Sequence, residues 1–113
     1  MDWFAAIDIY CERTASGFWN EPLNAWSNLS FIIAALWAAI EIQRRPGQPI
    51  IVYILTGLCF MIGIGSFLFH TFANTWSELA DVIPIWSFVA IYIFAAIGII
   101  GGVPAGKILR IAL

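Results

Sequence analysis

Charged residues are scarce in this chain, where they make up 11% of 113 residues while hydrophobic residues make up 62%. Soluble globular domains carry about 25% charged residues, so the composition excludes a water-soluble domain. The formal net charge is −2 and no basic patch occurs, which gives no basis for nucleic-acid binding. Two cysteines, Cys11 and Cys59, are too few for a disulfide framework, and His70 is the single histidine.

The few charges are clustered and leave three long uncharged stretches, at residues 22–40, 46–77 and 82–106. A helix of about 20 apolar residues crosses the hydrocarbon core of a bilayer, so each stretch holds one span. We therefore expect an all-α fold, a multi-pass transmembrane helix bundle that is integral to the lipid bilayer. The expected parts of this single membrane domain are an outer N-terminal segment at 1–20, spans at 21–42, 49–72 and 77–101, and the start of a fourth span at 104–113.

The basic residues indicate how the bundle is oriented. Arg44 and Arg45 follow the first span and Lys107 and Arg110 follow the third, whereas the opposite helix ends are acidic and carry only Arg13 as a cation. Cytoplasmic loops of membrane proteins are enriched in lysine and arginine. The N-terminus is therefore predicted to lie outside the cytoplasm.

Polar side chains occur in all three spans near the predicted outer face. Glu21 begins the first span, Ser66 and His70 lie one turn apart at the end of the second, and Asp81 lies one turn inside the third. The short connection makes the second and third helices antiparallel neighbours, so His70 and Asp81 can share one pocket. Ionisable groups at membrane depth usually face an interior cavity with a functional role.

Each of these residues also has a structural explanation. His70 could be an interfacial histidine that is hydrogen-bonded to a lipid headgroup or a carbonyl group. Asp81 could simply favour the positive end of the helix dipole, and Ser66 could bond back to the carbonyl four residues earlier. Glu21 could cap the first helix. The residues alone leave these alternatives open.

Local signals predict where the helices begin and bend. Asn20 is a good N-cap for the first helix, and residues 75–78 fit a capping box that opens the third. Pro84 removes a backbone hydrogen bond to the carbonyl of Ala80, which predicts a kink or a widened turn. Gly63 lacks a side chain and is expected to let another backbone approach the second helix.

Four motifs resemble the alkaline ceramidase family, and more closely its bacterial ceramidase-like branch. They occupy residues 8–13 (DIYCER), 18–28 (FWNEPLNAWSN), 65–70 (GSFLFH) and 78–81 (ELAD). The resemblance implies a seven-helix intramembrane amidase that cleaves ceramide, or a related lipid amide, into a sphingoid base and a fatty acid. It also implies a zinc ion held by one histidine at the end of helix two and a His-x3-His pair in the last helix, with water as the fourth ligand.

The resemblance gives the polar residues specific roles. His70 matches the zinc ligand of helix two, Asp81 matches the aspartate that orients or deprotonates the water, and Ser66 matches the serine that stabilises the oxyanion. Three protein ligands plus water is the pattern of catalytic zinc sites.

The family also binds calcium near the start of helix one. Glu12 and Glu21 match its carboxylate ligands, Tyr10 takes the place of a residue that offers its backbone oxygen, and Asp8 is offset by one from the aspartate of the family. Carboxylate and carbonyl oxygens suit a hard cation such as calcium. The alternative is an acidic segment that is merely solvated at the outer face.

The chain departs from the family in having no second histidine. His70 alone cannot build a tetrahedral zinc site, so we expect an N-terminal fragment of a longer enzyme or a truncated gene product. The isolated chain is expected neither to bind zinc tightly nor to hydrolyse amides. The alternative function is a non-enzymatic integral membrane protein, either receptor-like or a degenerate remnant of the family. The oligomeric state stays open.

Overall fold

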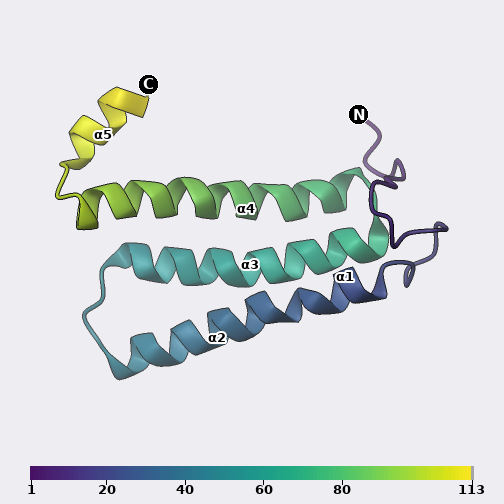
Figure 1. Ribbon diagram of the computed structural model, residues 1–113, viewed down its shortest axis with the longest axis horizontal. Helices are drawn as coiled ribbons and strands as arrows, with labels where there is room; N and C mark the ends of the chain where they lie inside the picture. The colour runs from purple at the N-terminus through teal and green to yellow at the C-terminus, as the bar shows by residue number, and fades with distance from the viewer. Residues whose placement is uncertain (113) are drawn as a thin grey trace.

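The computed structural model describes residues 1–112, in which three long helical rods lie side by side in one layer (Figure 1). In chain order the helices are α1 (Pro22–Ser27), α2 (Leu29–Arg44), α3 (Ile50–Phe72), α4 (Thr75–Ala95) with its π-helical extension η1 (Ala96–Ile100), and α5 (Ala105–Ala112). α1 and α2 follow each other nearly in line, and α3 packs between them and α4. Residues 1–112 contain no strand, so the predicted all-α fold is confirmed.

Three segments are long and apolar enough to cross a membrane: Pro22–Arg44, Ile50–Phe72 and Thr75–Ile100. The predicted set of three apolar spans is therefore confirmed. The short helix α5 packs against η1 and buries Ile108. Whether α5 begins a fourth span, and which side of the bilayer holds the N-terminus, stay predictions.

A break between α1 and α2 lies opposite Gly63 of α3. Asn28 separates the two helices, and its side-chain amide donates to the carbonyl of Asn24 at 2.7 Å. A Cβ added to Gly63 of α3 would lie 3.2 Å from both the Asn28 carbonyl oxygen and the Ile32 nitrogen. The predicted close approach at Gly63 is therefore confirmed.

The connection between α3 and α4 consists of Ala73 and Asn74. Ala73 adopts the left-handed conformation, with a φ of 47°, that commonly ends a helix. The side chain of Asn74 accepts from the Ser77 N–H at 3.3 Å, and the Ser77 hydroxyl accepts from the Asn74 N–H at 3.1 Å. The capping box predicted over residues 75–78 is therefore wrong by one residue, because Asn74 is a better N-cap than Thr75.

Pro84 lies inside α4, and the helix continues through it. The widened turn predicted near Pro84 occurs instead at η1, three turns further along. Proline has no N–H, so it leaves the carbonyl of Ala80 without its usual partner in the helix. Gly65 of α3 packs directly against this carbonyl, which draws α3 and α4 together at that level.

Candidate functional site

The beginnings of α1 and α4 meet the end of α3 at one end of the layer, and the N-terminal segment folds over this end (Figure 1). Backbone hydrogen bonds fix the segment to the α3–α4 connection. The Ile7 N–H donates to the Ala73 carbonyl at 2.7 Å, and the Thr75 N–H donates to the Ala5 carbonyl at 3.2 Å. The N-terminal segment is therefore an ordered cover over the helix ends.

His70 is buried on the last turn of α3 and pairs with Glu21, the N-cap of α1. Its Nδ1 lies 2.9 Å from Oε1 of Glu21. Burial raises the pKa of Glu21, but the hydrogen bonds from His70 and Arg13 outweigh it and hold the pKa below its ordinary value. Glu21 is therefore a carboxylate that only accepts, so Nδ1 of His70 carries the proton and Nε2 faces away from this bond.

Arg13 is the side chain that joins the N-terminal segment to this pair, and sequence reasoning gave it no role in the site. It is 6% exposed, and its Nε donates to Oε2 of Glu21. Its other nitrogens donate to the carbonyls of Ala15 at 3.3 Å, Gly17 at 3.0 Å and His70 at 3.1 Å. The signal that could have found it was its position as the one cation in an acidic segment.

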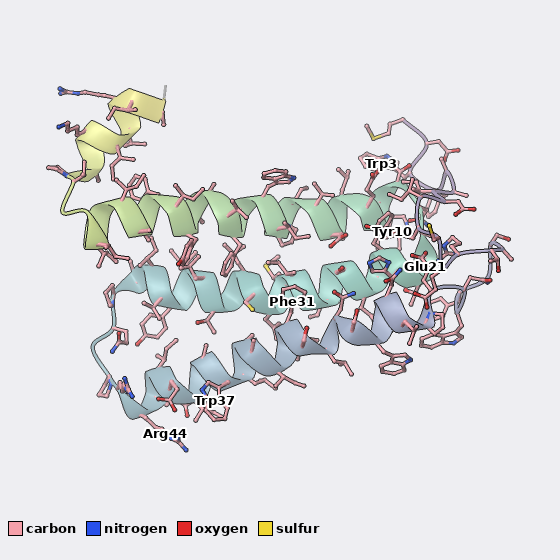
Figure 2. All side chains as sticks on the ribbon, in the orientation of Figure 1. Trp3, Tyr10, Glu21, Phe31, Trp37 and Arg44 are labelled. Atoms are coloured by element: carbon pink, nitrogen blue, oxygen red, sulfur yellow. The ribbon has the colours of Figure 1, made fainter. Side chains whose placement is uncertain are left out.

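Tyr10 lies over the imidazole ring of His70, with the ring centroids 4.7 Å apart and the planes 62° from parallel. Figure 2 shows Tyr10 and Glu21 at the same end of the layer, far from Arg44. Burial and the nearby charges of Asp81 and Glu21 raise the pKa of the Tyr10 hydroxyl. Tyr10 therefore remains a neutral phenol that shields the pair beneath it.

Asp81 and Ser66 occupy the facing surfaces of α4 and α3 and are both buried. Ser66 and His70 lie one turn apart on α3, and Gly65, the residue before Ser66, packs against the backbone of Ala80 and Asp81 in α4. The three side chains therefore lie near one contact between the two helices. Among residues 1–112, Oδ1 of Asp81 is the one buried side-chain oxygen or nitrogen without a hydrogen-bond partner. Oδ1 of Asp81 is thus a buried hydrogen-bond acceptor without a protein donor, inside the span of α4.

Two of the four residues expected to bind calcium, Glu12 and Glu21, already have N–H partners on their carboxylate oxygens. Both oxygens of Glu12 accept backbone N–H groups at the start of α1, from Leu23 at 2.6 Å and from Asn24 at 3.0 Å. Glu12 thus supplies the side-chain acceptors at the start of α1, while Glu21 occupies the N-cap position, so the prediction of Asn20 as the N-cap is wrong. Both oxygens of Glu21 are held by Arg13 and His70, while Asp8 and Tyr10 are exposed. Carboxylates already occupied by N–H donors do not fit a calcium ion.

The fit to zinc is partial. A histidine ligand usually donates its second ring N–H to a carboxylate, and the Glu21–His70 pair has this arrangement. His70 therefore fits one zinc ligand through Nε2. The part of the chain that the structure describes contains no group of three or more His, Cys, Asp or Glu side chains that could hold a metal.

An apolar groove runs between α3 and α4 beside this cluster. It has a volume of about 420 Å³, and its lining includes Ile64, Gly65, Leu68, Ala80 and Ile83. Ser66, His70 and Asp81 do not line the groove, but Gly65 and Ala80, which do, are the residues that precede Ser66 and Asp81 in the chain.

The fold and the site define a multi-pass α-helical membrane protein with a buried cluster of ionisable side chains at one end of its spans. A family model described as Ceramidase matches residues 5–110. The chain therefore belongs to the Ceramidase family, as its motifs predicted. Comparison with curated proteins and with solved structures gave no match.

Proposed function

We propose that the chain forms part of a membrane-embedded, zinc-dependent amide hydrolase that cleaves ceramide or a related lipid amide. The observation that carries this proposal is the group of buried side chains Ser66, His70 and Asp81 at the contact between α3 and α4, in which one aspartate oxygen has no partner. An unsatisfied buried polar group costs stability, so its presence calls for a chemical reason. In the proposed reaction, this oxygen of Asp81 accepts a hydrogen bond from the attacking water.

Each residue of the cluster has one task in this chemistry. His70 offers Nε2 to the zinc ion, while Glu21 holds the ring in place through Nδ1. Asp81 accepts the proton of the attacking water, and the Ser66 hydroxyl donates a hydrogen bond to the oxyanion that develops on the carbonyl oxygen. Zinc, when bound, lowers the pKa of the water and polarises the carbonyl group.

The groove between α3 and α4 supports a lipid as the substrate. Its lining is apolar, it lies within the spans, and it includes Gly65 and Ala80, the residues that precede Ser66 and Asp81. A long acyl chain in this groove would bring its amide group to the polar cluster without crossing water.

The proposal requires two further zinc ligands, because a catalytic zinc site has three protein ligands and residues 1–112 supply one. We place these ligands on helices outside the described residues. The same observation favours a second candidate, a non-enzymatic membrane protein that keeps the fold of the family without its metal centre.

The decisive experiment uses membranes from cells that express the gene encoding this chain. Release of fatty acid from a fluorescent N-acyl sphingosine is expected, with loss of activity in His70→Ala and retention in Ser30→Ala, a control on the exposed face of α2. Hydrolysis of no lipid amide by folded protein would instead support the non-enzymatic candidate.

The purified 113-residue chain tests the ligand requirement separately. Metal analysis is expected to find far less than one zinc per chain, and ceramide is expected to remain uncleaved. Stoichiometric zinc in this preparation would contradict the need for further ligands.

A further inference from the structure

The guanidinium group of Arg13 is surrounded by oxygen atoms from three separate parts of the chain. These are the Oε2 atom of Glu21 at the start of α1, the carbonyls of Ala15 and Gly17 in the N-terminal segment, and the carbonyl of His70 in α3. One carboxylate and three carbonyl oxygens are also the kind of ligands that a calcium ion takes.

The position of Arg13 suits a fixed positive charge. The His70 carbonyl is one of the last carbonyls of α3, which have no partner within the helix and form the negative end of its dipole. The Arg13 side chain is 3% exposed, so its charge is screened little by water. A guanidinium group has five N–H donors in a fixed plane and can therefore bind several oxygens at once.

The contacts of Arg13 also determine how Glu21 is placed. Arg13 holds Oε2, which leaves Oε1 to face Nδ1 of His70 at 2.9 Å. Without a cation at this place, one oxygen of a carboxylate that is 2% exposed would lose its partner, and Glu21 could rotate away from the imidazole. The orientation of His70 thus depends on Arg13 through Glu21.

We propose that Arg13 is a built-in cation that takes the place of a bound calcium ion in this chain and, through Glu21, positions His70. Its role as a positioning residue for catalysis rests on the proposed function. The chain then needs no calcium at this place, and removal of the guanidinium group would leave a site for one. Four protein oxygens would remain there, with water to complete the six to eight ligands that calcium takes.

The experiment follows the single histidine by nitrogen-15 NMR in detergent micelles, without zinc or substrate. In the unmodified chain and in Arg44→Ala, an exposed arginine at the opposite end, the His70 proton is expected on Nδ1 whether calcium chloride or EDTA is added. Arg13→Ala in EDTA is expected to lose this tautomer preference, and calcium chloride is expected to restore it.

Two results would overturn the proposal. One is a change in the His70 spectrum of the unmodified chain when calcium is added or chelated. The other is an Arg13→Ala spectrum in EDTA that equals that of the unmodified chain. Should Arg13→Ala lose its helical circular dichroism in EDTA, recovery with calcium supports the proposal, and failure to fold in both conditions overturns it. None of these readings depends on amide hydrolysis, so the proposed function can fail while this proposal stands.

Discussion

Gly65 of α3 lies against the carbonyl group of Ala80 in α4, so closely that a Cβ at Gly65 would come within 1.9 Å of the Ala80 oxygen. Pro84 makes this contact possible, because it cannot donate the N–H that would otherwise occupy that carbonyl. A Cα–H group can then serve as a weak donor to the freed oxygen. Ser66 and Asp81 are the next residues on the two helices, so the same contact brings them together.

The close contact predicts a large effect of one methyl group. Gly65→Ala is expected to push α3 away from α4 and to lower the free energy of unfolding by about 1–3 kcal/mol or more, since the overlap is with backbone atoms that cannot turn aside. Unfolding in mixed detergent measures this loss. Gly57→Ala is the matched control on α3, because its Cβ would meet nothing within 4 Å. Equal stability of the two variants would contradict the packing described for Gly65.

Glu21 is predicted to be essential to the stability of the end of the bundle where the N-terminal segment covers α1, α3 and α4. Glu21→Gln removes the charge that pairs with Arg13 and leaves a buried guanidinium group uncompensated, which costs about 3–5 kcal/mol. Glu41→Gln is the control, since Glu41 pairs with the exposed Arg44 at the other end and such pairs contribute about 0.2–1 kcal/mol. Both values come from the same unfolding measurement. A loss in Glu21→Gln as small as that in Glu41→Gln would show that the pair with Arg13 is not stabilising.

The sequence predicted the spans because about 20 uncharged residues in a row allow few other structures. The sequence also predicted that His70 and Asp81 lie at the same end of the bundle, because a short connection makes α3 and α4 antiparallel neighbours. It could not predict the partners of Arg13, since the His70 carbonyl lies 57 residues away along the chain. The role of Glu12 at the start of α1 was hidden for the same reason, because the acceptor comes from a separate segment rather than from the preceding residue. Contacts of the irregular N-terminal segment have no periodic pattern from which they could be inferred.

Ser66 is predicted to act on the rate of the proposed hydrolysis rather than on substrate binding. Ser66→Ala removes one hydrogen-bond donor to the oxyanion, so kcat should fall about 10²–10³-fold while KM changes little. Steady-state hydrolysis of a fluorescent ceramide by membranes containing the enzyme measures both constants. Ser30→Ala, on the exposed face of α2, should leave them unchanged. A rise in KM with kcat preserved would place Ser66 in substrate binding instead.

Asp81 provides a test of whether a buried polar group is kept for function at the expense of stability. Its Oδ1 has no partner, and an unsatisfied buried group costs about 1–3 kcal/mol, so removing the charge in Asp81→Asn should leave the chain as stable as before or more stable. The same substitution should abolish lipid amide hydrolysis, because asparagine cannot accept the proton of the attacking water. Thermal unfolding is measured on the purified chain and hydrolysis on membranes that contain the enzyme, with Asp8→Asn as the exposed control that changes neither. If Asp81→Asn unfolds more easily than the unmodified chain, Asp81 stabilises the fold. Its unpaired oxygen is then no evidence for a role in catalysis.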